Sequence, residues 1–247
     1  MIRSIIILLF ALFIPLKANS QELRVAVAAN AQFVTQALKK VFEEETGIKT
    51  TLIISSSGKL TAQIKQGAPF DVFLSADMKY PETLYKDGLT ANKPEVYAYG
   101  KLVIWTLGKT DVSKGLDVLQ SPGISKIAIA NPQTAPYGVA AVEAVKKAGL
   151  YANVKPELVY GESISQVNQY LLSGAAEIAL TAKSVVLSPA MKNRGKWVEV
   201  DNNLYEPIAQ GVVVTKTAQK TEAQKFYRFL FSKKAQNIFK EYGYLIK

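Results

Sequence analysis

The chain has 247 residues and a formal net charge of +10, and it contains neither Cys nor His. The lack of both residues excludes disulfides, thiolate or imidazole metal sites, Ser-His-Asp and Cys-His catalytic arrangements, and a lipid-modified cysteine. The basic residues are scattered, and pairs such as Lys146-Lys147 lie late in helix-like stretches, where cations complement the helix dipole. Because no basic stripe carries interleaved aromatic residues, we expect no nucleic-acid partner.

Residues 1–20 have the pattern of a secretory signal peptide. Arg3 precedes an apolar run from Ile5 to Leu16, and Ala18-Asn19-Ser20 supplies small residues where a signal peptidase cuts. This run is shorter than the roughly 17 to 25 apolar residues that span a bilayer. We expect cleavage before Gln21 and a monomer free in a bacterial periplasm. An uncleaved anchor and an extracellular destination are the alternatives.

Strand-like and helix-like runs alternate along the rest of the chain. The first expected strand covers 23–29, and the apolar residues that follow recur at helical spacing until Gly47. Further strands are expected at 51–55, 71–75, 102–106, 127–130, 158–160, 178–181 and 212–215. Further helices are expected at 60–66, 81–87, 139–148, 164–172 and 223–231. This order predicts an α/β fold with mostly parallel sheets.

Short polar clusters stand between a strand-like run and a helix-like run at four places. These are Ala29-Asn30, Ser55 to Gly58, Pro136 to Gly138, and Glu162 to Ser165. Each cluster would open a helix, whose first turn has unpaired backbone N–H groups and a partial positive charge. Several such ends that face one crevice make an anion site without Lys or Arg.

Two lobes are expected, because open α/β sheets bind ligands in the crevice outside the carboxyl ends of their strands. Two of the polar clusters would then come from each lobe. We place the crossings between lobes near 97–100 and 207–211. The first lobe would comprise residues 21–98 and 210–247, and the second lobe residues 99–209.

Four stretches carry a resemblance to a known family. They are Ser55-Ser56-Ser57-Gly58, residues 67–77 (GAPFDVFLSAD), residues 131–138 (NPQTAPYG) and residues 240–244 (KEYGY). In this order, over nearly the whole mature chain, they resemble the periplasmic molybdate-binding proteins of molybdate ABC importers. The resemblance implies a type II periplasmic binding protein fold, with two α/β lobes joined by two crossing hinge segments. It also implies capture of molybdate or tungstate, an inner-membrane permease with its ATPase as partner, no catalysis and no cofactor.

The resemblance assigns four ligand positions, at which the molybdate oxyanion would be bound through its oxygens. Asn30 marks the subgroup with Asn in the first binding loop, and its backbone N–H is the expected donor, with the side-chain amide left open as a second one. Ser57 would donate through its hydroxyl and N–H, Tyr137 through its N–H and phenol, and Ile164 through its N–H alone. Secondary candidates are Ala29, Ser56, Gly58 and Thr181, the last at a position where some members place a binding tyrosine.

Other ligands and one other class of protein remain open. Fixed neutral donors suit a fully deprotonated oxyanion, whereas a protonated phosphate needs an acceptor carboxylate. Sulfate is the main competing ligand, and phosphate, ferric and sugar-acid ligands are further alternatives. The string from Ser56 to Lys59 fits the S-x-x-K motif of acyl-serine enzymes. Neither S-D-N nor K-T-G accompanies it, so an acyl-serine enzyme is a remote alternative.

Overall fold

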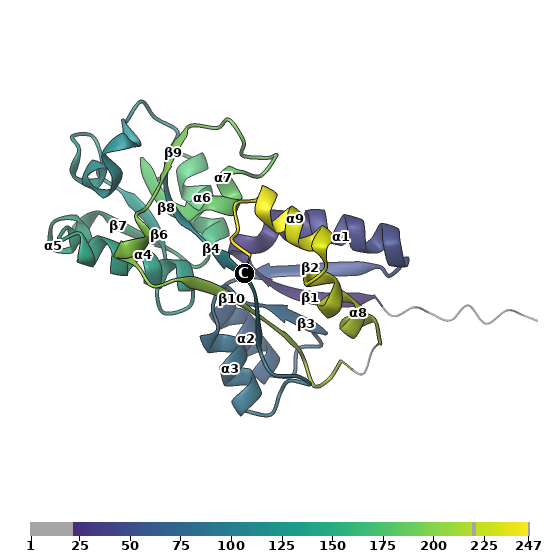
Figure 1. The fold of residues 1–247 in the computed structure, drawn as a ribbon. Coiled ribbons are helices and arrows are strands. Elements are labelled where there is room, and N and C mark those ends of the chain that lie inside the picture. The colour runs from purple at the N-terminus through teal and green to yellow at the C-terminus, as the bar shows by residue number, and fades with distance from the viewer. Residues whose placement is uncertain (1–21, 219–220, 247) are drawn as a thin grey trace, which may run out of the picture.

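The computed structural model describes residues 22–218 and 221–246 and has two lobes (Figure 1). Within these residues, each lobe is built on a five-stranded sheet with helices packed against it. The strand order is β2-β1-β3-β10-β4 in the first lobe and β7-β6-β8-β5-β9 in the second lobe. The α/β two-lobed fold predicted from the sequence is therefore confirmed.

Both ends of the described chain contribute to the first lobe. Its elements are β1 (Leu23–Ala28), the 3-10 helix η1 (Ala29–Ala31), α1 (Gln32–Thr46), β2 (Thr50–Ser55), α2 (Ser57–Lys65), β3 (Val72–Leu74), α3 (Lys79–Lys86), β4 (Glu95–Gly100), β10 (Ile208–Val214), α8 (Thr221–Leu230) and α9 (Lys233–Glu241).

The second lobe is formed by the middle of the chain. Its elements are β5 (Leu102–Thr106), η2 (Val112–Gln120), β6 (Ile127–Ala130), α4 (Pro136–Lys147), α5 (Tyr151–Val154), η3 (Lys155–Glu157), β7 (Leu158–Gly161), α6 (Ile164–Leu172), β8 (Ile178–Ala182), α7 (Lys183–Val186), β9 (Lys196–Glu199) and η4 (Asn202–Leu204).

The strands and helices expected from the sequence are present, but several boundaries differ: β10 begins at Ile208 rather than at residue 212, and two helices begin earlier at the polar clusters. α2 begins at Ser57 rather than at residue 60, and α4 begins at Pro136 rather than at residue 139. The polar residues therefore form the first turns of these helices instead of preceding them. β4, β9, α9 and the short helices were not predicted, because brief or charged segments give little periodic signal.

Successive side chains of β1 point to opposite faces of the sheet and pack in two separate hydrophobic clusters of the first lobe. Val25 and Val27 point to one face and pack in a cluster with residues of α1, α8 and α9, including Phe42 and Phe226. Ala26 points to the other face, where it packs in a cluster with residues of α2 and α3. β1 is consequently buried on both faces, and its carboxyl end is held rigidly where the chain enters η1.

Both sheets are mostly parallel, as predicted, because four of the five strands in each sheet run in one direction and a single strand, β10 or β5, runs in the other. β1 runs parallel to β2 and β3, and β6 runs parallel to β7 and β8. β10 is antiparallel to β3 and β4, and β5 is antiparallel to β8 and β9. β5 and β10 each enter their sheet from the other lobe, so they run away from the inter-lobe crevice while β1, β3, β6 and β8 run toward it.

The two lobes are joined where β4 passes into β5 and where the chain returns before β10. β4 ends at Gly100, and β10 begins opposite it at Ile208. Leu245 pairs with Tyr99 through backbone N–H···O bonds of 2.8 and 2.9 Å, so the C-terminal segment also lies along this hinge.

Among the described residues, no helix has the length and apolar character needed to cross a membrane. The expected signal peptide, residues 1–20, lies outside the described residues.

Candidate functional site

A small cavity lies between the two lobes and is lined by residues that precede or open helices. They are Ala28, Ala29, Asn30, Ser56, Ser57, Ala76, Ala135, Pro136, Tyr137 and Ile164. The cavity volume open to the centre of a water-sized molecule is about 10 Å³. Since roughly 10 to 15 Å³ by this measure holds one water molecule, the cavity suits only a ligand of a few atoms.

Helix N-termini from both lobes meet at the cavity. The segment η1–α1 and α2 come from the first lobe, and α4 and α6 come from the second lobe (Figure 1). The residues before these helices are Ala28, Ser56, Ala135 and Ser163, and each has an extended backbone and makes no side-chain capping bond. No capping side chain therefore occupies the first-turn N–H groups, and those without a backbone partner can serve an anion, unlike that of Gly58, which donates to the Thr134 carbonyl.

The two serines of the second cluster differ in their partners. Ser57 Oγ accepts a hydrogen bond from the N–H of Ala76 at 3.0 Å, which leaves its own proton available as a donor. Ser56 Oγ is buried and has no hydrogen-bond partner among the described residues. A buried hydroxyl without a partner costs about 1 to 3 kcal/mol, so a ligand or water in the cavity would stabilise Ser56.

Asn30 lines the cavity, but its side chain is turned to the hinge. Its Nδ2 donates to Oε1 of Gln210 at 2.8 Å and to the hydroxyl of Tyr244 at 3.1 Å. Both amide protons are thus used within the protein, so the side chain, which the sequence left open as a second donor, is bonded to the hinge in this structure. Its backbone N–H, in the first turn of η1, remains the donor that can serve an anion.

Tyr137 and Ile164 bring the second lobe to the cavity. Ile164 is the first residue of α6 and is buried. Tyr137 is buried in the first turn of α4, and its hydroxyl has no hydrogen-bond partner among the described residues. Burial raises the pKa of Tyr137 well above its ordinary value, so the phenol keeps its proton and remains a donor.

The secondary ligand candidates fall into two groups, according to whether they line the cavity. Ala29 and Ser56 line the cavity, whereas Gly58 and Thr181 do not. Gly58 N–H donates instead to the carbonyl of Thr134 in the other lobe at 2.9 Å. The hydroxyl of Thr181 donates to Oδ1 of Asn168 at 2.7 Å, which fixes α6 on β8 within the second lobe.

None of the described residues that line the cavity carries a formal charge. Lys59, in the first turns of α2, forms an ion pair with Glu162 of the second lobe. The pairing of Ser56 with Lys59 that an acyl-serine enzyme needs is therefore not formed. The described residues also contain no group of three or more acidic side chains placed to hold a metal ion.

Direct bonds between lobes show that the structure is in a closed arrangement. Ser165 Oγ donates to Oε1 of Gln32 at 2.9 Å, and the hydroxyl of Tyr80 donates to the carbonyl of Gln133 at 3.2 Å. Gly58 lies so near Thr134 that a Cβ on it would approach the Thr134 carbonyl oxygen to 3.0 Å. The mouth of the cavity is thus closed by contacts that opening of the lobes would break.

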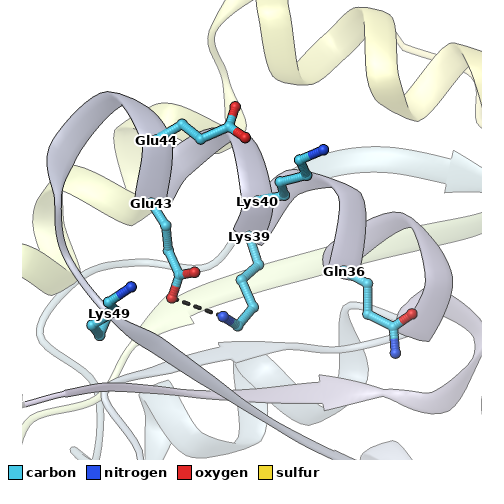
Figure 2. Close-up of a pocket in the computed structure, with 6 residues that line it drawn as sticks. All are labelled: Gln36, Lys39, Lys40, Glu43, Glu44 and Lys49. Atoms are coloured by element: carbon cyan, nitrogen blue, oxygen red, sulfur yellow. Dashed lines mark ion pairs between the residues drawn. The ribbon is translucent and has the colours of Figure 1, made fainter.

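A larger depression on α1 has different chemistry (Figure 2). Its volume is about 350 Å³, and it is lined by Gln36, Lys39, Lys40, Glu43, Glu44 and Lys49. Lys39 and Glu43 form an ion pair of 2.8 Å, drawn as a dashed line in Figure 2. This depression therefore carries charges of both signs on one lobe, unlike the cavity between the lobes, where the lining residues that the structure describes are uncharged.

Some cavity residues were not singled out in the sequence. Ala28 and Ala135 directly flank the predicted clusters, and Pro136 begins the third cluster without having been assigned a ligand role. Ala76 follows β3, and no helix opens directly after it, so the pattern of a strand followed by a helix start does not identify it. Its position after a buried strand, on the same sheet edge as Asn30, is the available signal.

Comparison with known proteins agrees with this geometry. Residues 23–245 match the family model of bacterial extracellular solute-binding proteins. The chain is 40% identical over 229 residues to the molybdate-binding protein ModA of Azotobacter vinelandii, covering 92% of this chain and 91% of the relative. It is 38% identical over 232 residues to the protein of that name from Rhodobacter capsulatus, covering 93% and 90%.

A solved structure, the periplasmic molybdate-binding protein of Azotobacter vinelandii, superposes with a TM-score of 0.86 at 36% sequence identity. The match covers 92% of this chain and 100% of that protein. Agreement in sequence and in fold thus extends over both lobes and the hinge. The chain therefore belongs to the family of bacterial extracellular solute-binding proteins that includes these molybdate-binding proteins.

Proposed function

We propose that this protein captures molybdate, and tungstate as well, between its lobes and delivers the ion to an ABC importer. The observation that carries this proposal is the convergence of helix N-termini from both lobes on one small cavity, whose described lining residues are uncharged. The similarity of nearly the whole chain to molybdate-binding proteins supports the choice of ligand.

The proposed contacts are hydrogen bonds from neutral donors. The backbone N–H groups of Asn30, Ser57, Tyr137 and Ile164 would donate to the oxyanion, together with the hydroxyls of Ser57 and Tyr137. The partnerless hydroxyl of Ser56 is a further donor, and Ala29 contributes its backbone to the same turn. A buried dianion must replace its bonds to water, and this set of fixed donors does so without a desolvated lysine.

The same donor set predicts which anions are rejected. A singly protonated phosphate brings a proton that needs an acceptor, and no carboxylate is among the described residues that line the cavity. Sulfate has the right charge but is smaller, so its oxygens would not reach donors from both lobes at once. The small cavity volume also disfavours a sugar acid.

Transport would proceed by closure of the lobes about the two crossing segments. An anion that binds loops from both lobes favours the closed state, and the closed surface is then presented to the permease of an inner-membrane ABC importer with its ATPase. In this proposal residues 1–20 direct export and are cleaved, so that a monomeric carrier without enzymatic activity or cofactor acts in the periplasm. The lobes correspond to the two sheets, with crossings near Gly100 and Ile208.

A titration panel tests the ligand. Calorimetry of the mature protein with molybdate, tungstate, sulfate and phosphate should give tight binding of the first two. Sulfate should bind at least about 100-fold more weakly, a difference of about 2.8 kcal/mol, and phosphate should not bind. Small-angle scattering should show compaction when molybdate is added. Equal affinity for sulfate would refute the selectivity, and absence of binding to all four anions would refute the function.

A further inference from the structure

Gln210 is a buried glutamine at the start of the apolar hinge strand β10. It is 0% exposed and lies between Ile208 and the run Val212 to Val214. A primary amide in such surroundings is costly unless its donors and acceptor are bonded. Its partners therefore indicate why this position carries a polar side chain.

Those partners connect two segments of the proposed anion site. Gln210 Oε1 accepts the bond from Nδ2 of Asn30 at 2.8 Å. Gln210 Nε2 donates to the carbonyl of Ala76 at 3.3 Å, and the N–H of Ala76 donates to Oγ of Ser57 at 3.0 Å. A continuous buried chain of hydrogen bonds thus runs from Ser57 through Ala76 and Gln210 to Asn30.

The backbone of the hinge is adapted to this arrangement. The register between β4 and β10 shifts between Gln210 and Gly211, and a bulge of this kind re-aims the side chain beside it. Gly100 of β4, which pairs with Ile208, lies close to the Gln210 amide. A Cβ on Gly100 would lie 3.0 Å from Gln210 Nε2 and 2.1 Å from the hydroxyl of Tyr137. Only glycine leaves room for both groups, so the Gln210 amide and the second-lobe Tyr137 lie together against the hinge.

We infer that Gln210 is a positioning residue that sets the spacing between the Asn30 and Ser57 loops and thereby the choice among tetrahedral oxyanions. The inference rests on the proposed function. Discrimination by ion size requires donors held to within a fraction of an ångström, and loops supported only by their own backbone would adjust to a smaller ion. Gln210 fixes both loops to the strand about which the lobes close.

The test compares a substitution in β10 with one directly after its end. Gln210→Met keeps the approximate length of the side chain and removes its hydrogen bonds. Thr215→Val is the matched control, because Thr215 follows β10 directly, is also buried and donates at 2.5 Å to the carbonyl of Phe70. Calorimetry measures molybdate and sulfate affinities, and thermal unfolding without ligand measures the stability of each variant.

Gln210→Met should lower molybdate affinity about tenfold, which is the effect of one lost hydrogen bond. The ratio of molybdate affinity to sulfate affinity should fall by a similar factor. Thr215→Val should lose stability while the ratio stays at the wild-type value. A wild-type ratio in Gln210→Met overturns the inference, as does an equal fall in Thr215→Val. If the wild-type protein itself fails to bind molybdate, the proposed function fails instead.

Gln210→Glu provides a second variant of nearly the same shape, which covers the case in which the methionine variant does not fold. Its carboxylate accepts from Asn30 but cannot donate to Ala76, whereas the protonated carboxyl can do both. Burial raises a carboxyl pKa, so the introduced side chain should be ionised at pH 9 and gain its proton as the pH falls to 6. The ratio of molybdate affinity to sulfate affinity should therefore be lowered at pH 9 and recover at pH 6. A ratio lowered at both pH values also supports the role, and a wild-type ratio at both overturns it.

Discussion

Ser184 of the second lobe donates a hydrogen bond from its Oγ to the carbonyl oxygen of Asn30 in the first lobe, at 2.7 Å. The same carbonyl also accepts from the hydroxyl of Tyr244 at 3.3 Å. The turn that is proposed to present the Asn30 N–H to the ligand is therefore fixed through its carbonyl by hydrogen bonds from both lobes. Closure of the lobes and orientation of a ligand donor depend on the same contact.

Ser184→Ala should weaken molybdate binding about five- to tenfold, because a hydrogen bond to the closed state is lost without a change in the ligand contacts. Most of the loss should lie in faster release, which stopped-flow measurements can resolve. Ser188→Ala is the control, since Ser188 is equally buried and its Oγ donates within the same lobe to Val185 at 2.7 Å. Unchanged release from Ser184→Ala would contradict the prediction.

Gly58→Ala should prevent full closure. The added Cβ would lie 2.9 Å from the Tyr80 hydroxyl and 3.0 Å from both Cα and O of Thr134 in the other lobe. We expect at least about a 100-fold loss of molybdate affinity with little change in unfolding temperature. The clash with the Thr134 backbone exists only when the lobes are closed, and the Tyr80 hydroxyl of the same lobe is the end of a flexible side chain that can move. Scattering should then show no compaction with molybdate. Gly108→Ala, whose nearest contact would be an ordinary 3.6 Å, should behave as wild type.

Lys59→Met should leave molybdate affinity within about fivefold of wild type. The ion pair of Lys59 with Glu162 is 44% and 55% exposed, and exposed pairs contribute only about 0.2 to 1 kcal/mol. The matched control is Lys65→Met, since Lys65 on the same helix pairs with Asp87 within one lobe at similar exposure. Calorimetry at low salt measures both variants. A loss of affinity beyond about 100-fold would mean that the anion is bound by a formal charge, against the proposal.

Tyr137→Phe should separate binding from stability. The hydroxyl is buried without a partner among the described residues, so its removal should leave the unliganded protein as stable or slightly more stable. Molybdate affinity should fall about tenfold if the phenol donates to the ligand. Tyr205→Phe, which removes bonds to Leu102 and Asn202 away from the cavity, should show the reverse pattern in unfolding and calorimetry. Wild-type affinity in Tyr137→Phe would restrict Tyr137 to its backbone N–H.

Stability should decline at alkaline pH because of the buried tyrosines. Burial raises the pKa of Tyr244 from 10.0 to about 12, and it raises the pKa of Tyr97 well above 10.0. The unfolded chain loses these protons near pH 10 while the folded chain retains them, so stability is complete below pH 10 and falls as the pH rises toward 12. A pKa difference of one corresponds to about 1.4 kcal/mol. Urea unfolding from pH 8 to 11 should show a smaller decline for Tyr244→Phe than for wild type, and identical declines would refute this assignment.

The sequence predicted which segments meet at the cavity better than it predicted the side chains that support them. The first turns at Asn30, Ser57, Tyr137 and Ile164 line one cavity, as expected from strands that end at a common edge. The sequence left open where the Asn30 amide points. Its partners Gln210 and Tyr244 lie 180 and 214 positions away in the chain, beyond the reach of any local pattern.

The single reversed strand in each otherwise parallel sheet was beyond local pattern. Each strand run is apolar whether it is parallel or antiparallel to its neighbour, so periodicity alone does not give the direction of β5 and β10. Their direction follows from the crossings, because a strand that enters a sheet from the other lobe starts at the crevice. The antiparallel pairs are thus a consequence of the hinge.

The sequence by itself determined the alternation of strands and helices, the positions where helices open, and the absence of Cys and His chemistry. These features depend on residues only a few positions apart. The tertiary structure alone decided which donors remain free for a ligand and which are bonded within the protein, as Asn30 Nδ2 and Ser56 Oγ illustrate. The physical reason is that a buried polar group bonds to whatever the packing of both lobes brings within about 3 Å.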